Sequence, residues 1–178
     1  MLRNILVYGL VAGLVVAIPM NLMMIFMKDH PPLAWGMVFG YVTMLVALSA
    51  VFIGIKRYRD MELGGVIRFW PALGLGLGIS VVAGILYALA WELSLALTHM
   101  DFAAAYANTL IAEKKAAGAS AEAIAQLTAE MDAFKVQYAN PLFRMPMTFA
   151  EIFPVGVLVS LISAALLCNR RILALRHA

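Results

Sequence analysis

The sequence has little charge: Asp, Glu, Lys and Arg together make up 13% of its 178 residues. Soluble domains carry roughly 25%, so the composition argues against a protein with a fully hydrated surface. Cysteine occurs once, at Cys168, which excludes an intramolecular disulfide. We also find no nucleophile set, metal-ligand spacing or phosphate-binding loop. We therefore expect a protein that is not an enzyme and that uses no cofactor.

Long apolar stretches take the place of charge, and hydrophobic residues form 64% of the chain. Crossing a hydrocarbon core of ~30 Å takes ~20 helical residues. Four stretches are long enough: 5–27, 35–55, 70–97 and 146–168. The first is longer than the ~7–15 apolar residues of a signal peptide, so we expect it to be retained as a span. The sequence predicts an all-α integral membrane protein with four transmembrane helices.

The long polar segment of the chain, residues 98–145, lies between the third and fourth spans. It predicts an extracytoplasmic helical hairpin with arms over 101–117 and 120–139. Gly118 suits the end of the first arm, and Ser120 is placed to cap the start of the second. We therefore divide the chain into the first three spans within 1–97, the hairpin over 98–145, and the fourth span with a basic tail over 146–178.

The second arm carries apolar residues at alternating spacings of three and four, which predicts a seam that packs against the first arm. The seam consists of Ile124, Leu127, Met131, Phe134 and Tyr138. Asn140-Pro141 should end this arm, because proline disfavours a helical residue before it. We see no helix breaker between the third span and the first arm, so the sequence allows one helix from Pro71 to Ala117.

Basic residues define the orientation, because cytoplasmic span ends are enriched in Lys and Arg. Eight of the thirteen lie on one proposed side: Arg3, Lys56, Arg57, Arg59, Arg68, Arg170, Arg171 and Arg176. We therefore expect both termini and a 56–69 loop in the cytoplasm, residues 98–145 outside, and a location in the inner (plasma) membrane.

Several motifs along nearly the whole chain carry a family resemblance. They are residues 36–41 (GMVFGY), 53–60 (IGIKRYRD), 64–67 (GGVI), 118–120 (GAS) and 151–156 (EIFPVG). In these motifs the chain resembles domain-of-unknown-function family 4199, a family of small bacterial membrane proteins. The resemblance implies four spans with a polar insert before the last, and a membrane location. It implies no activity.

Glu92 and Glu151 lie in the outer parts of apolar spans, where a carboxylate is costly and needs a partner or a wet cavity. If the hairpin folds back at its tip, Glu92 lies level with Arg144, and Glu151 lies level with Tyr87. One interpretation is structural, with each carboxylate bonded to that partner. The other is functional: a proton or cation site, or a groove for a lipid headgroup.

Other residues carry weaker signals. Lys56, Arg57, Arg59 and Arg68 form a basic cytoplasmic loop that either contacts anionic lipid or a partner, or simply anchors the spans. The Gly pairs 9/13, 36/40 and 74/78 favour close helix packing, within one bundle or between copies. Met20, Met23, Met24 and Met27, or His30 and His99 with Asp29 and Asp101, are weak metal candidates.

From these features we expect an assembly or accessory subunit that acts through its outer hairpin and small-residue helix faces. The alternative is a transport or lipid-handling component that uses Glu151 and Glu92. The expected partners are membrane lipids and either another membrane protein or a second copy of the chain, and not nucleic acid.

Overall fold

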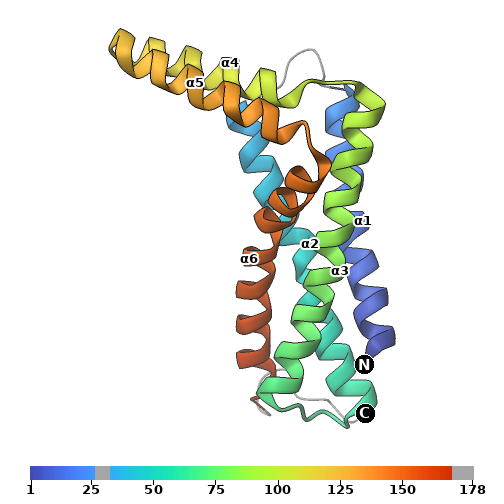
Figure 1. The fold of residues 1–178 in the computed structure, drawn as a ribbon. Helices are drawn as coiled ribbons and strands as arrows, with labels where there is room; N and C mark the ends of the chain where they lie inside the picture. Colours follow the sequence, from blue (N-terminus) through green and yellow to red (C-terminus); the bar gives the residue numbers. More distant parts are fainter. Residues whose placement is uncertain (27–32, 170–178) are drawn as a thin grey trace.

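The computed structural model describes residues 1–26 and 33–169, and it describes side chains for 1–25 and 38–169. The described residues form six helices and no strand (Figure 1). These are α1 (Leu2–Phe26), α2 (Leu33–Glu62), α3 (Phe69–Thr98), α4 (Phe102–Ala116), α5 (Ala121–Tyr138) and α6 (Pro141–Leu167). Helices α1, α2, α3 and α6 are long and apolar enough to cross a membrane, which confirms the predicted architecture.

Helix α3 is the centre of the bundle, because it packs against α1, α2 and α6. The start of α1 and the end of α6 lie at one end of the bundle, and α4 and α5 lie at the other (Figure 1). The core draws on all four spans, with buried Ala12 and Val16 from α1, Leu48, Val51 and Ile55 from α2, Leu75 and Ile79 from α3, and Ile152 and Leu167 from α6. The outward faces of the spans remain apolar, as a lipid environment requires.

Glycines allow α1 and α3 to approach closely. A Cβ atom at Gly9 would lie 2.5 Å from Val82 Cβ, and one at Gly13 would lie 2.5 Å from Leu86 Cδ1. Gly78 faces α1 in the same way, with Ile5 Cδ1 2.8 Å from a Cβ built there. These three glycines therefore serve packing within the bundle, where dispersion contacts replace the hydrophobic drive that lipid does not supply.

The other glycines of the three pairs behave differently. A Cβ at Gly40 would meet nothing within 4 Å, and one at Gly74 would meet only Met1 Cε at 3.9 Å. Gly36 lies outside the residues whose side chains are described. Homo-oligomerisation through Gly40 or Gly74 stays a prediction.

The expectation of one helix from Pro71 to Ala117 is wrong. Helix α3 ends at Thr98, and His99 adopts the left-handed conformation (φ 51°, ψ 26°) while its N–H bonds Leu95 O. A new helix begins at Phe102, with the Asp101 side chain accepting a hydrogen bond from Ala104 N at 2.9 Å. Asp101 thus acts as an N-cap that separates the span from the first arm.

Two other predicted boundaries also shift. Helix α2 continues to Glu62, so the first half of the predicted 56–69 loop is helical, and the turn that follows uses Gly64 and Gly65 at positive φ. Helix α6 begins at Pro141 rather than at residue 146, with the Asn140 side chain capping Leu142 N at 2.9 Å. Proline fits the first turn of a helix because its missing N–H would have no partner there.

Candidate functional site

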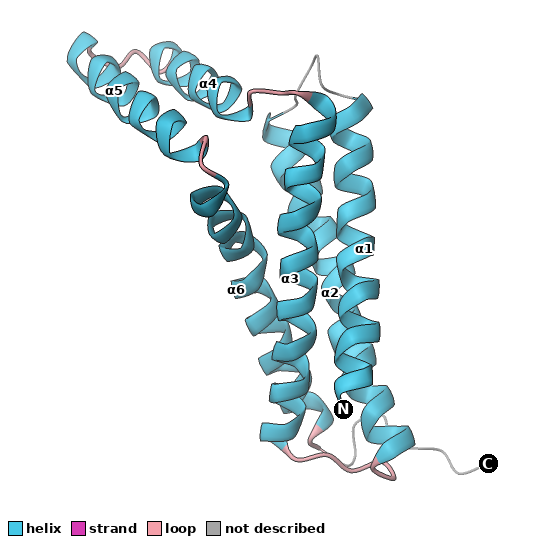
Figure 2. Cartoon of the chain, turned by 45° about the vertical axis from the view of Figure 1, so that its right-hand side comes forward, coloured by secondary structure: helices cyan, strands magenta, loops and turns pink. Residues whose placement is uncertain are grey.

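The helical hairpin formed by α4 and α5 does not continue the axis of the bundle. It leans sideways and extends past α6, away from α1 and α3, in both views (Figures 1 and 2). Helices α4 and α5 pack on each other, and α5 also packs on the start of α6. The hairpin is therefore an arm joined to the bundle at its base.

The tip of the hairpin confirms two sequence predictions. Gly118 has a φ of 74°, the left-handed conformation that ends a helix with little strain in glycine. The Ser120 side chain accepts a hydrogen bond from Ala123 N at 3.2 Å and so caps α5. Both arms end within one or two residues of the predicted positions.

The predicted seam of α5 is its less exposed face. Tyr138 is buried and the other four seam residues are half-buried, whereas most of the residues between them are exposed. Near the base of the hairpin the seam meets aromatic residues of α4, with ring centroids 5.8 Å apart for Phe102 and Tyr138 and 6.0 Å apart for Tyr106 and Phe134. Aromatic pairs at these distances stabilise a contact beyond the apolar area that they bury.

Trp91 of α3 connects this aromatic layer to the membrane bundle. Its ring meets Phe102 edge-on at 5.0 Å, and its Nε1–H donates a hydrogen bond to Tyr138 Oη at 2.7 Å. Burial raises the pKa of Tyr138 to about 12, so the hydroxyl stays protonated at physiological pH. The sequence analysis did not identify Trp91 or Phe102 as contact residues. The signal for this contact was an aromatic residue on each side of residues 99–101, where the chain changes from α3 to α4.

Glu92 and Arg144 form the predicted contact. The Arg144 Nε–H donates to Glu92 Oε1 at 2.6 Å, and Nη2 donates to the other carboxylate oxygen. Arg144 Nη1 also donates to Tyr138 O at 3.0 Å, and the guanidinium lies 5.4 Å from the centre of the Tyr138 ring. Such a bidentate pair fixes geometry as well as charge. It ties α3, α5 and α6 together at the base of the hairpin.

Glu151 and Tyr87 also meet as predicted, because Tyr87 Oη donates a hydrogen bond to Glu151 Oε2 at 3.3 Å. Tyr87 is buried at 7% exposure, but the Glu151 side chain is exposed on α6. Glu151 therefore has the partner that the structural interpretation predicted, but its side chain is exposed on α6 and lines neither of the two described hollows.

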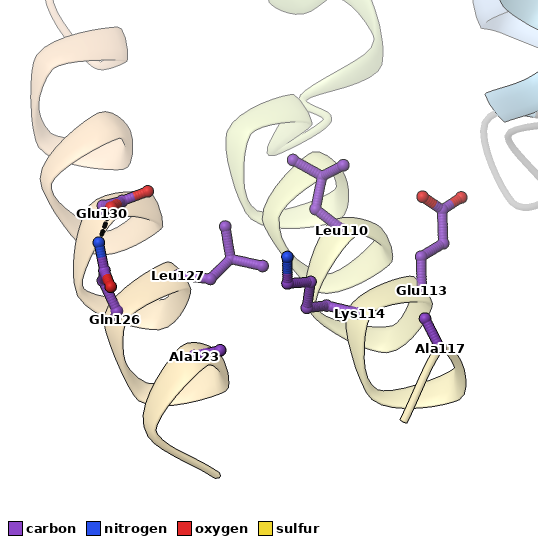
Figure 3. Close-up of a pocket in the computed structure, with 8 residues that line it drawn as sticks. All are labelled: Leu110, Glu113, Lys114, Ala117, Ala123, Gln126, Leu127 and Glu130. Atoms are coloured by element: carbon purple, nitrogen blue, oxygen red, sulfur yellow. Dashed lines mark hydrogen bonds between the residues drawn. The ribbon is translucent and has the colours of Figure 1, made fainter. Parts of the chain in front are cut away.

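The distal half of the hairpin contains a hollow of about 490 Å³ between its two helices (Figure 3). We call it the tip groove; it is lined by Leu110, Glu113, Lys114 and Ala117 of α4 and by Ala123, Gln126, Leu127 and Glu130 of α5. Leu127 points from α5 toward α4, and Gln126 Nε2 donates to Glu130 Oε1 at 3.0 Å on the outer wall. The sequence offered one signal for the groove: near the tip, α4 has charged and small residues where a tight seam would need large apolar ones.

The basic residues at the other end of the bundle do not form one exposed patch, which corrects the prediction for Arg59. Its side chain is fully buried, with Nε donating to Asp60 Oδ1 at 2.7 Å and Nη1 to Leu167 O at 3.4 Å. Lys56 pairs with the same Asp60 at 2.7 Å. Arg57 and Arg68 are exposed and remain candidates for lipid or partner contact.

A second hollow of about 190 Å³ lies at this end of the bundle, lined by Arg3, Asn4, Arg57, Met61 and Glu62. Glu62 is the acidic residue of this lining. The Asn4 side-chain amide donates a hydrogen bond to Glu62 Oε1 at 3.0 Å, and Arg3 Nη2 lies 3.8 Å from the same oxygen. These contacts hold the start of α1 to the end of α2.

Of the weak metal candidates, Met27, Asp29 and His30 lie outside the described residues. Within the described ranges, no three His, Cys, Asp or Glu side chains gather as a metal site.

Comparison with known proteins places the chain in a family. It belongs to the family described as protein of unknown function (DUF4199), whose pattern matches residues 7–169. The resemblance in the sequence motifs is thereby confirmed. No curated protein and no solved structure matches the chain.

Proposed function

We propose that this protein is a non-enzymatic accessory or assembly subunit of a membrane complex, and that its outer hairpin holds a partner protein. The observation that carries the proposal is the form of the hairpin. It extends sideways from the bundle, joins it at one end, and opens into the tip groove at the other.

The hairpin has a small core of its own. Ala103, Ala107 and Tyr138 are its buried residues, and the large side chains of the tip groove remain partly exposed. Its helices contain 15 and 18 residues, and most of the stability of protein helices comes from tertiary packing. The aromatic layer and the Glu92–Arg144 pair stabilise the base but not the tip. A partner seated in the tip groove would bury the partly exposed side chains of Leu110 and Leu127 and contact the polar residues around them.

The same proposal includes a location: the inner (plasma) membrane of a bacterium, with both termini in the cytoplasm and residues 98–145 outside. The distribution of basic residues supports this orientation. The fold is consistent with this orientation, because the start of α1 and the end of α6 both lie at the side of the bundle opposite the hairpin (Figure 1).

The alternative, a transport or lipid-handling role for Glu92 and Glu151, has less support. Both oxygens of Glu92 are bonded to Arg144, so this carboxylate is engaged. Neither of the two described hollows includes Glu92 or Glu151. A transport role would need a wet path to a carboxylate that is free to change its partner.

Site-specific photo-crosslinking in native membranes tests the proposal. Benzoylphenylalanine is placed at Leu127 in the tip groove or, as a control, at Val136, which is 77% exposed on the same helix two residues from Phe134 and off the seam. We expect a crosslink from Leu127 to one distinct protein, in several-fold higher yield than from Val136. The absence of protein crosslinks at both positions would contradict the proposal.

A further inference from the structure

Helix α6 carries an exposed stripe along its outward face. Its members recur at helical spacing and include Met147, Leu158 and Ile162, which are 45%, 60% and 59% exposed, together with exposed Glu151 and Pro154. The opposite face of α6 is buried against α3, where a Cβ at Gly156 would lie 2.7 Å from Ser80 Cβ. The stripe therefore faces away from the bundle, and Glu151 is its one charged member.

The tryptophans of α3 indicate the depth of Glu151. Trp70 and Trp91 lie near opposite ends of α3, about 31 Å apart at 1.5 Å per residue, and tryptophan prefers the two interfaces of a bilayer. That separation matches a hydrocarbon core of about 30 Å. Tyr87 lies one turn, about 6 Å, inside Trp91. Because Tyr87 bonds Glu151, the carboxylate lies just inside the outer edge of the hydrocarbon core.

Glu151 lacks the partners that a carboxylate at this depth needs. Among the described residues its bonding partner is the Tyr87 hydroxyl, through one oxygen at 3.3 Å. An ionised carboxylate offers about four acceptor sites, so most of its capacity is unused. Charged residues inside membranes usually pair with one another or face water, so a carboxylate with one hydroxyl partner at this depth is a candidate site for a further contact.

We infer that Glu151 is the docking point for a transmembrane helix of a partner protein, and that this helix carries Lys, Arg or His in the outer half of its span. The inference rests on the proposed function and adds the chemistry of the partner. The hairpin extends past α6 on the side away from the bundle (Figures 1 and 2). A helix on the exposed stripe would therefore lie below the hairpin, so that one partner could occupy both surfaces.

A second copy of the chain fits this position less well. A second copy would have to offer Glu151 a basic side chain from the outer half of a span. Among the described residues of the spans that side chain is Arg144, which is already paired with Glu92. A zwitterionic phospholipid also fits less well, because its amine lies farther out than its phosphate. On α6 the order of charge is the reverse: Glu151 lies about 10 Å deeper than Arg144, at 1.5 Å per residue.

Photo-crosslinking within the membrane tests the inference. Benzoylphenylalanine is placed at Met147 or Leu158, which flank Glu151 on the stripe, and at Leu14 of α1 as a control that is 52% exposed. Crosslinked peptides are identified by mass spectrometry. We expect Met147 and Leu158, but not Leu14, to crosslink to a transmembrane peptide with a basic residue in its outer half. Glu151→Gln and Glu151→Leu should each lower the yield about tenfold, since a loss of ~1.4 kcal/mol corresponds to that factor.

A charge exchange completes the test. Glu151→Lys should abolish the crosslink, and changing the partner's basic residue to Glu should restore it. Crosslinks to a second copy or to lipid alone, a partner peptide without a basic residue, or an unchanged yield in Glu151→Gln would each overturn the inference. If the Leu127 crosslink on the hairpin persists while those at Met147 and Leu158 are absent, this inference fails and the proposed function stands. If all three are absent, the proposed function fails as well.

Discussion

The membrane bundle and the α4–α5 hairpin are both built from packed helices, but they use different residues to pack. In the bundle, glycine and serine bring helices together, as at Gly156, Ser80 and Ser160 between α6 and α3. In the hairpin, large aromatic rings meet at its base, while its tip remains open. The contrast follows from the two surroundings. In lipid there is no hydrophobic effect between helices, so they associate through the dispersion contacts that close backbone approach allows. In water the burial of large aromatic rings is itself stabilising.

The two regions also differ in how complete they are. The bundle buries more than half of the central stretch of α3 and leaves outward faces that suit lipid. The hairpin buries little and leaves apolar side chains at its tip partly exposed. We conclude that the bundle is closely packed, with an unfilled contact at Glu151 on α6, and that the hairpin leaves a larger part of its surface open.

The largest expected effect is an all-or-none difference in accessibility. With Cys168→Ser as background, the substitutions Ser120→Cys and Arg57→Cys place one thiol on the hairpin tip and one at the opposite end of the bundle. A membrane-impermeant maleimide on intact cells should label the first and not the second, because the bilayer separates them. Permeabilised cells should label both. The opposite pattern in intact cells, or equal labelling, would refute the proposed orientation.

A bulky residue in the bundle should give the largest loss of stability. Gly156→Leu forces side-chain atoms into Ser80, so it should lower stability by about 1–3 kcal/mol, a typical cost of overpacking. Gly40→Leu is the matched control, because a Cβ there meets nothing within 4 Å. Thermal unfolding in detergent compares the two. Similar melting temperatures would show that the α3–α6 crossing is not close-packed.

A charge in the hairpin seam should open the hairpin and leave the bundle intact. Phe134→Asp places a carboxylate against Tyr106 and Tyr138, at a cost of about 1–3 kcal/mol. Ala129→Asp, on an exposed face of the same helix, should have little effect. Limited proteolysis of the outer segment is the readout, with membrane insertion unchanged in both. Equal protease resistance would mean that the seam is not what holds the arms together.

The smallest expected effect concerns the stability of Glu151 variants. Glu151→Gln keeps an acceptor for Tyr87, so stability should change by less than about 0.5 kcal/mol. Glu151→Leu removes that acceptor and should cost about 1 kcal/mol. Thermal unfolding of the purified variants in detergent measures both. A large loss of stability in Glu151→Gln would show that the carboxylate stabilises the isolated chain, and would argue against a role in binding a partner.

Much of the fold could be predicted because its signals are local. The spans follow from the length of apolar stretches, and the hairpin tip follows from Gly118 and Ser120. The contacts of Glu92 with Arg144 and of Glu151 with Tyr87 followed from the symmetry of a chain that folds back at that tip. No packing information was needed for these pairs.

The rest depends on tertiary contacts that no local pattern records. His99 is not a strong helix breaker, yet it adopts a left-handed conformation where α3 ends. Arg59 was counted with the exposed cytoplasmic residues, but the end of α6 provides the carbonyl of Leu167 that its buried side chain bonds. The tip groove arises because α4 and α5 differ in side-chain size at matching levels, which a seam on one arm does not reveal.

The role of the hairpin in assembly is tested most directly by the size of the complex solubilised from native membranes. Native gel electrophoresis would compare the natural protein with the double variant Lys114→Glu and Gln126→Glu, which changes the charge of the tip groove at two exposed positions and leaves the seam residues unchanged. We predict that the natural protein migrates in a complex larger than the chain alone and that the variant migrates as the free chain, while its melting temperature in detergent is unchanged. A complex of the same size in both proteins would contradict the assignment of the hairpin as the docking element.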